Sequence, residues 1–322
     1  MENEVIVRAE HIKKYFAIKD VLGKTINEVK AVDDISLSLK KGETYGLVGE
    51  TGCGKSTLGR SLLRLVEPTA GSIFIDNKDF LKMKGKELHE YRRKVQMVFQ
   101  DPYMSLDPKR RIGKTLMESL QIHNIGNKNE QMERAMDILG QVGLLPEHFY
   151  RFPHEFSGGQ RQRIGLARAL ILNPDIVVCD EPVSALDVSV QSQIINLLLD
   201  LQEQRNISYV FIAHDMSVVK YISTRIGVMY LGNMMEESST DELFAMPQHP
   251  YTKALLSAVP DSNPHTRKGH IVLQGEIPSP LNAPKGCVFC TRCPYCMKKC
   301  KEERPVLKAV MGEHKVACHL YD

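Results

Sequence analysis

An α/β fold, with a parallel sheet covered by helices on both faces, is predicted by three features of this 322-residue chain. Strand-like and helical runs alternate along most of the sequence, which is the pattern of a parallel sheet. A glycine-rich loop, residues 49–57, follows the apolar run 45–48 and precedes a helical pattern. Residues 176–181 are four apolar residues followed by two acids, as expected where a buried parallel strand reaches its carboxyl end.

The glycine-rich loop has the composition of a site for nucleotide phosphates. Its glycines let backbone amides close around the phosphates, Lys55 brings a positive charge to the β- and γ-phosphates, and Ser56 offers a hydroxyl to Mg²⁺. The candidate nucleotide contacts are Gly49, Glu50, Thr51, Gly52, Cys53, Gly54, Lys55, Ser56 and Thr57.

A second glycine-rich loop, formed by Ser157, Gly158, Gly159 and Gln160, opens another helical run. Unpaired backbone N–H groups and the helix dipole at such a helix start both attract anions. Two loops of this kind in one chain imply one nucleotide held from two sides.

The two acids that end the run 176–181 have separate expected roles. Asp180 holds the hydrated metal, and Glu181 faces the attacking water as a general base. An acidic pair at a strand end is often only a helix cap, and a phosphate loop also occurs in plain nucleotide-binding folds. The order of these motifs along one chain favours the hydrolytic interpretation.

The overall composition is that of a globular protein that does not cross a membrane. Hydrophobic residues make up 43% of the chain. No stretch approaches the roughly 18 apolar residues of a spanning helix, and residues 1–4 are acidic, unlike the basic start of a signal peptide. The net charge of +3 is too small to indicate nucleic-acid binding.

In this order the motifs resemble the ATP-binding subunits of ABC transporters, and the similarity runs from about residue 5 to the C-terminus. Residues 49–57 match the family's Walker A motif, and residues 157–160 match its signature motif, with Phe156 where leucine is commoner. The resemblance implies that Gln100 contacts metal and water, that Asp187 belongs to the D-loop at the ATP site, and that His214 senses the γ-phosphate. The implied catalytic residues are Glu181, His214 and Gln100, and the implied Mg²⁺ ligands are Ser56, Gln100 and Asp180.

An aromatic side chain near the N-terminus stacks on adenine in this family. Phe16 occupies the matching place, and Tyr15 beside it is the alternative. Residues 17–30 look like an insertion that could shift the position of the aromatic, and either ring could instead belong to the core.

The resemblance also implies a P-loop NTPase fold of the ABC ATPase type. That fold comprises a RecA-like parallel-sheet core, an antiparallel N-terminal β subdomain, an inserted helical subdomain at about residues 101–170, and here a small cysteine-rich C-terminal extension. Apolar residues recur at helical spacing between residues 116 and 142, which agrees with the inserted subdomain. We expect two domains, residues 1–245 and residues 246–322.

Six of the eight cysteines lie in residues 275–322. Disulfides are disfavoured in a cytosolic chain, so metal or cluster ligation is the preferred interpretation. Zinc usually takes two close pairs of thiolates, whereas a crowded run of cysteines favours an iron–sulfur cluster. Cys53 and Cys179 lie inside the nucleotide motifs and are expected to be small buried residues.

The proline-containing lead at residues 275–280 and the cysteines resemble the peptide-transporter branch of the family, whose members carry a [4Fe–4S] cluster. The resemblance implies the ligand set Cys287, Cys293, Cys300 and Cys318. A competing set, Cys290, Cys293, Cys296 and Cys300, has the spacing of a bacterial ferredoxin. Lys301 stands where the ferredoxin pattern has proline, which favours the set shared with the family.

Residues 59–65, 181–189 and 229–232 resemble the OppF/DppF-like ATPase of this branch. The implied partners are a second, non-identical OppD/DppD-like ATPase, two permease subunits and an extracytoplasmic solute-binding protein, with this chain on the cytoplasmic side of the inner or plasma membrane. ATP would close the two ATPases into a sandwich, with each nucleotide between Lys55 of one chain and the Ser157 loop of the other.

Three other interpretations stay open at this point. A soluble ABC ATPase of DNA repair or ribosome function would carry insertions and a basic groove that the sequence does not show. An importer of another solute, such as nickel chelates, would share the same ATPase motifs. A regulatory iron–sulfur protein with a vestigial ATPase is disfavoured by the complete set of hydrolytic residues.

Overall fold

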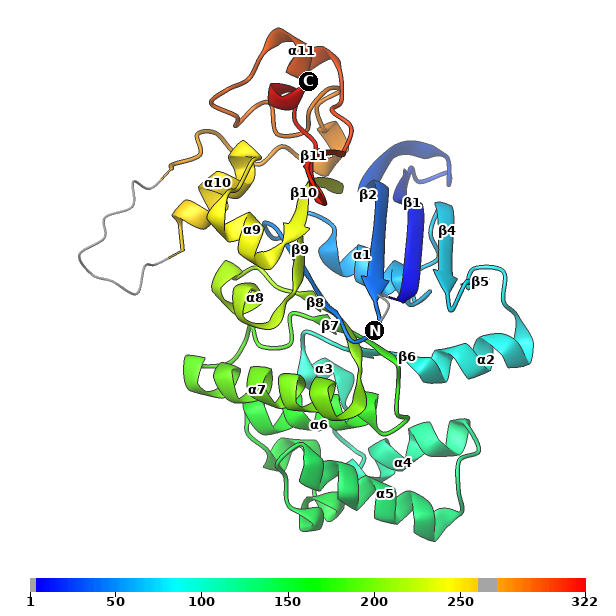
Figure 1. Cartoon of the computed structure of the whole chain (residues 1–322). Helices are drawn as coiled ribbons and strands as arrows, with labels where there is room; N and C mark the ends of the chain where they lie inside the picture. Colours follow the sequence, from blue (N-terminus) through cyan, green and yellow to red (C-terminus); the bar gives the residue numbers. More distant parts are fainter. Residues whose placement is uncertain (1–3, 260–270) are drawn as a thin grey trace, which may run out of the picture. The chain divides into compact units, whose positions relative to one another are not determined.

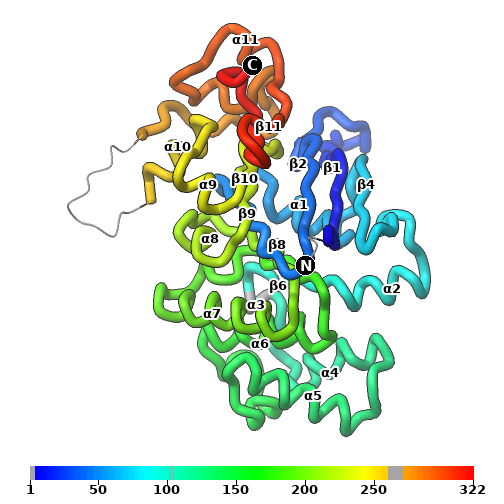
Figure 2. Tube along the Cα trace, in the orientation of Figure 1, coloured from blue at the N-terminus to red at the C-terminus, as the bar shows by residue number. Residues whose placement is uncertain are grey.

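The computed structural model describes residues 4–259 and 271–322, and Figures 1 and 2 label its elements. The described chain divides into two compact units. Unit 1 is built mainly from Asp79–Ile212. Unit 2 is built from Val5–Leu39, Thr44–Lys78 and the described part of Ala213–Asp322.

Short parallel strands form the core of unit 1. In parallel register, β6 (Val95–Val98) pairs with β7 (Ile176–Asp180), and β7 pairs with β8 (Ser208–Ile212). Every residue of β7 and β8 is buried, which is why their sequences are almost continuously apolar rather than alternating. The predicted strand at 176–181 is confirmed as far as Asp180, and Glu181 lies just beyond it.

Helices make up most of the remainder of unit 1. Those between β6 and β7 confirm the inserted helical subdomain, and their buried apolar side chains include Leu116, Leu120 and Leu139. Local capping fixes where α5 begins, because Asn127 and Glu130 exchange side-chain to backbone hydrogen bonds. The helices and 3₁₀ turns are α2 (Gly85–Lys94), α3 (Pro102–Ser105), α4 (Ile112–Ile122), α5 (Lys128–Gln141), η1 (Pro146–Tyr150), η2 (Pro153–Glu155), α6 (Gly158–Leu170) and α7 (Val188–Arg205).

Long antiparallel strands begin unit 2. In the N-terminal sheet, β1 (Val5–Lys19) lies between β2 (Thr25–Lys40) and β4 (Ala70–Ile75), and β5 (Lys78–Asp79) follows β4 (Figure 1). The pairing of β1 with β4 is antiparallel and places Val7 opposite Ile75 and Ala9 opposite Ile73. All four of these side chains are buried, so one face of the sheet is apolar, and the predicted antiparallel N-terminal β subdomain is confirmed.

The second set of strands in unit 2 pairs a strand from the N-terminal part of the chain with strands from its C-terminal part. In parallel register, β3 (Thr44–Val48) pairs with β9 (Arg225–Tyr230), and β9 pairs with the antiparallel β10 (Asn233–Ser239). On the other edge of β10 lies β12 (His314–Val316), which pairs in turn with β11 (Lys308–Met311). The remaining elements are α1 (Lys55–Leu62), α8 (Met216–Ile222), α9 (Thr240–Ala245), α10 (Pro250–Ser257), η3 (Pro280–Asn282), α11 (Lys298–Glu302) and η4 (His319–Tyr321).

Candidate functional site

The glycine-rich loop connects β3 to α1 in unit 2, as its sequence context predicts. Gly54 has φ of 103°, and a Cβ atom placed there would lie 2.0 Å from the carbonyl oxygen of Ala31. At Gly49 the corresponding distance to the carbonyl oxygen of Met229 is 2.1 Å. Only glycine fits at these two positions, because the backbone both adopts positive φ and passes close to neighbouring carbonyls.

Lys55 is buried at the first turn of α1, and its ammonium group faces the loop. Its Nζ donates to the carbonyl oxygens of Gly49 at 2.7 Å and Glu50 at 3.1 Å. The loop therefore curls around a buried positive charge, which is the arrangement that attracts phosphate. Ser56 and Thr57 follow in the same turn and are partly exposed.

Burial raises the pKa of the Cys53 thiol, although Lys55 opposes this effect. Its Sγ lies 3.7 Å from the Lys55 Nζ. Cys179 is fully buried within β7, and burial raises its pKa as well. Both thiols are thus neutral packing groups at physiological pH, as expected from their positions in the sequence.

The predicted catalytic carboxylate lies where β7 ends in unit 1. Asp180 is fully buried, and Glu181 turns out of the strand with φ of 46° while its N–H donates to the carbonyl of Ile212 at 3.0 Å. The Nε2 of Gln100 donates to the Oε2 of Glu181 at 2.9 Å. The structure thus brings together two of the three predicted catalytic residues, and Gln100 holds the carboxylate in one orientation.

The signature loop begins α6 with a complete capping box. The N–H of Gln160 donates to the Ser157 Oγ at 3.4 Å, and the N–H of Ser157 donates to the Gln160 Oε1 at 3.0 Å. Ser157 remains exposed, and Gly158 and Gly159 begin the helix behind it. The loop therefore presents a helix N-terminus to the surface of unit 1, which suits an anion.

Asp187 and His214 are both exposed residues next to helix starts. Asp187 precedes α7 and makes no side-chain cap. His214 lies two residues after β8, and the next residue, Asp215, caps α8 by accepting the N–H of Ser217 at 2.7 Å. The roles of Asp187 and His214 stay predictions.

Of the two candidate aromatics on β1, Phe16 has the more accessible ring. It is 43% exposed, and the Lys14 Nζ lies 4.9 Å from the ring centroid. The hydroxyl of Tyr15 instead donates to the carboxylate of Asp33, which ties that ring to β2. This difference favours Phe16 as the ring that stacks on a base.

The C-terminal segment, residues 271–322, supplies a contact to the glycine-rich loop. No sequence pattern indicated the residue that makes this contact. Arg292 lies between Cys290 and Cys293, and its Nη1 contacts both carboxylate oxygens of Glu50, at 2.7 and 3.0 Å. Because the two residues are 242 positions apart, neither motif spacing nor periodicity connects them.

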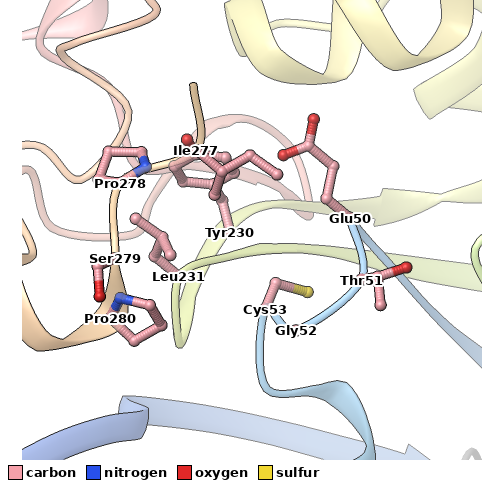
Figure 3. A pocket seen from close by; sticks show the side chains of 10 residues that line it. All are labelled: Glu50, Thr51, Gly52, Cys53, Tyr230, Leu231, Ile277, Pro278, Ser279 and Pro280. Carbon is pink, nitrogen blue, oxygen red and sulfur yellow. The ribbon is translucent and has the colours of Figure 1, made fainter. Parts of the chain in front are cut away.

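A second part of the C-terminal segment also faces the loop. A cavity of about 260 Å³ lies between loop residues 50–53 on one side and residues 277–280 on the other (Figure 3). Tyr230 and Leu231, where β9 ends, complete its lining. The glycine-rich loop is thus bordered by the C-terminal segment at two places.

The predicted iron–sulfur ligands gather in one part of unit 2. Cys287, Cys300 and Cys318 are buried, Cys293 is half-buried, and the Cys287 N–H donates to the carbonyl of Cys300 at 2.8 Å. Across residues 4–259 and 271–322, however, no three His, Cys, Asp or Glu side chains converge as the ligands of one metal ion. Four thiols are the donors that an iron–sulfur cluster requires.

Electrostatic interactions connect the thiols of both candidate ligand sets. Burial, together with Cys300, Cys290 and Cys318, raises the pKa of Cys287 to about 12. Burial, with Cys318, Cys300 and Cys296, raises the pKa of Cys293 to about 11. Cys318 interacts with both of these thiols, and so do cysteines of the competing set, Cys290 with Cys287 and Cys296 with Cys293, so these interactions do not distinguish the two sets.

Comparisons with known proteins show the family of this chain. A family model described as ABC transporter matches residues 32–184, and one for the C-terminal region of oligopeptide/dipeptide transporters matches residues 235–300. The chain is 52% identical over 322 residues to the oligopeptide transport ATP-binding protein AppF of Bacillus subtilis, covering 99% of this chain and 98% of AppF. It is 47% identical over 321 residues to the dipeptide transport ATP-binding protein DppF of Haemophilus influenzae, covering 100% and 98%.

A solved structure shares the fold. The ATP-binding cassette MJ0796, as a dimer in a post-hydrolysis state bound to ADP and Pi, is 29% identical, with a TM-score of 0.65, and covers 73% of this chain and 98% of its own. The chain therefore belongs to the ABC transporter ATPases, within the group of oligopeptide and dipeptide transport ATP-binding proteins. In the part of the chain that the structure describes, no helix is both long and apolar enough to span a bilayer.

Proposed function

We propose that this chain hydrolyses ATP to power the import of peptides through an ABC transporter. The observation that carries the proposal is the loop curled around the buried Lys55 ammonium, which is a preformed site for nucleotide phosphates. The near full-length identity to AppF and DppF, whose names specify oligopeptide and dipeptide transport, supports peptides as the cargo.

Each candidate residue has a defined task in this proposal. Residues 49–57 and Phe16 bind ATP, and Glu181, held by Gln100, accepts the proton of the attacking water. His214 senses the γ-phosphate, and Asp187 contributes to the ATP site. By resemblance to the family, Ser56, Gln100 and Asp180 would be the ligands of Mg²⁺, which would supply positive charge to neutralise the phosphates.

The exposed signature loop supports a site shared between two ATPases. We infer that Ser157, Gly158, Gly159 and Gln160 contact the nucleotide bound to a second, non-identical subunit. Two permeases and an extracytoplasmic solute-binding protein complete the proposed complex, which places this chain on the cytoplasmic face of the membrane. No nucleic acid is needed in this scheme.

A pair of substitutions tests the hydrolytic assignment. Glu181→Gln removes the general base while keeping a side chain that can pair with Gln100, so ATP still binds and turnover falls by roughly 10²–10⁴. Lys55→Ala instead weakens ATP binding itself, because it removes the charge that faces the phosphates. Equilibrium ATP binding and steady-state hydrolysis by the assembled transporter measure the two effects.

The partner ATPase must carry its own inactivating substitution in this experiment, because its site would otherwise mask the loss. Wild-type turnover in the Glu181→Gln complex would contradict the assignment of the base. Uptake of a labelled peptide, compared with a nickel chelate, by the wild-type transporter then separates the two cargo classes.

We also propose that Cys287, Cys293, Cys300 and Cys318 hold a [4Fe–4S] cluster. Their common location supports this set, and so does burial, because Cys287, Cys300 and Cys318 are buried whereas Cys290 and Cys296 are partly exposed. The cluster would cross-link a segment that has few helices and strands of its own.

Metal analysis of anaerobically purified protein tests the cluster. About four irons per chain are expected, because a single set of four thiolates accommodates one cubane. Cys318→Ser should lose iron, whereas Cys290→Ser should keep it. The reverse pattern would favour the ferredoxin-like set, and one zinc in a colourless protein would overturn both.

A further inference from the structure

Glu50 of the glycine-rich loop is held at three points. Its N–H donates to the Tyr251 hydroxyl at 2.9 Å, its carbonyl oxygen accepts from the Lys55 Nζ at 3.1 Å, and its carboxylate pairs with Arg292. Both groups of the pair are largely shielded from solvent, since the side chain of Arg292 is 9% exposed and that of Glu50 is 23% exposed. A partly buried ion pair of this kind is screened much less by salt than a surface pair.

Arg292 is itself fixed by the surrounding side chains. Its N–H donates to the carbonyl of Phe289 at 3.1 Å, and its Nη1 lies 3.4 Å from the Tyr230 hydroxyl. The rings of Phe289, Tyr230 and Tyr251 pack against one another with centroids 4.8 to 5.3 Å apart. The guanidinium is thus presented to the loop by a rigid aromatic cluster, and Tyr251 of that cluster also contacts the backbone of Glu50.

The charge of Glu50 is unfavourable for a phosphate site. A carboxylate on a loop that binds an anionic nucleotide repels the phosphates unless a cation neutralises it. Arg292 supplies that cation from outside the loop, and its contact with both carboxylate oxygens keeps the carboxylate directed toward the C-terminal segment.

We propose that Arg292 is a positioning residue for nucleotide binding, which neutralises Glu50 and holds the glycine-rich loop in its binding conformation. This inference rests on the proposed function, since it assumes that residues 49–57 bind ATP. It makes the C-terminal segment part of the nucleotide site of the same chain.

Removal of the guanidinium tests the proposal in the full-length chain. Arg292→Met keeps an apolar side chain against Tyr230 but leaves the Glu50 carboxylate unpaired. The Kd for ATP, measured by displacement of a fluorescent ATP analogue, should rise about tenfold, which corresponds to about 1.4 kcal/mol. An unchanged Kd in a folded Arg292→Met protein overturns the proposal.

A double substitution shows whether Arg292 acts through Glu50. In a Glu50→Gln background the unpaired charge is absent, so adding Arg292→Met should change the Kd by less than about threefold. A tenfold loss in that background would mean that Arg292 acts by another route. This comparison remains valid even where Arg292→Met alone fails to fold.

Two controls separate this inference from the proposed function. Lys315→Ala removes another cation of the C-terminal segment, one that pairs with Glu237 and not with the loop, and should leave the Kd unchanged. Lys55→Ala should abolish tight binding. If Lys55→Ala binds ATP normally the site assignment fails, whereas a loss confined to Lys55→Ala overturns only the role of Arg292.

Discussion

At the scale of single residues, Glu181 has an unusual backbone conformation directly after β7. A non-glycine residue in the left-handed region costs on the order of 1 kcal/mol, and here φ is 46°. Backbone hydrogen bonds from Glu181 to Ile212 and from Ser184 to Glu181 hold the conformation. The turn directs the carboxylate out of the buried strand to Gln100, so the strain serves the position of the proposed base.

The glycines of the phosphate loop differ in what they can tolerate. Gly54→Ala would force its Cβ against the Ala31 carbonyl at positive φ, so it should abolish ATP binding and lower the free energy of unfolding. Gly23→Ala is the matched control, because Gly23 has φ of 82° but no atom within 4 Å of the added Cβ. It should cost only the backbone strain, about 1–2 kcal/mol. Equal losses of stability in urea unfolding would contradict the steric argument.

The residues found from sequence were those with local signatures. Lys55 and Ser56 follow the loop glycines, and Glu181 ends an apolar run, so local sequence context indicated them as candidates. Arg292 could not be found in this way, because its function depends on a contact with Glu50 that only the fold creates.

At the scale of elements, helix starts were predictable wherever the cap is local. The Ser157 and Gln160 capping box that begins α6 lies within four consecutive residues. The pairing of β12 with β10 was not predictable, because a strand of three residues carries little periodicity and its partner lies far away in sequence.

The start of α10 should make the stability of the fold depend on pH. The N–H of Tyr251 donates to the His249 Nδ1 at 3.0 Å, and burial lowers the pKa of His249 to about 4, with Glu236 opposing and Lys253 assisting. In the unfolded chain the pKa of His249 is about 6.5. Between about pH 6.5 and pH 4 the unfolded state therefore binds more protons than the folded state, so the free energy of unfolding decreases as pH falls through this range. The full loss is roughly 3 kcal/mol at most.

Replacement of the imidazole isolates this effect. His249→Asn keeps a cap acceptor without a titrating group, so urea unfolding between pH 4 and 7 should show a flatter profile than wild type. The net pKa of His314 is raised. Burial alone would lower it, but the carboxylates of Glu236 and Glu242 outweigh burial. The contribution of His314 to the free energy of unfolding is therefore lost as pH rises. An unchanged slope in His249→Asn would exclude His249 as the source.

At the scale of the whole molecule, the proposed function divides each ATP site between two chains. Ser157→Arg places a bulky cation in the signature loop, so hydrolysis at the partner's site should fall. The mutant chain's own affinity for ATP should remain within about twofold, because residues 49–57 are unaltered. ATPase assays of complexes with one inactive site, together with ATP binding by the isolated subunit, measure both effects. Loss of binding by the isolated mutant would place the loop at its own site.

The sequence order of the motifs was sufficient to predict the ABC ATPase fold, including the inserted helices between β6 and β7. It could not show that the C-terminal segment completes unit 2 through β12, Arg292 and the Cys318 region. The predicted boundary at residue 245 stays a prediction, although β12 pairs with a strand that precedes that boundary.

The pairing of β10 with β12 has a consequence for biosynthesis. The ribosome makes β10 long before β12, and at 5–20 residues per second the outer edge of β10 waits roughly several seconds for its neighbour. During that interval Glu236 lacks His314 and Glu237 lacks Lys315, although Glu237 also pairs with Arg225 of the earlier strand β9. Two acidic side chains on an unpaired strand edge discourage pairing with other nascent chains. The same carboxylates that contact the finished C-terminal segment would therefore disfavour edge-to-edge association of the unfinished protein.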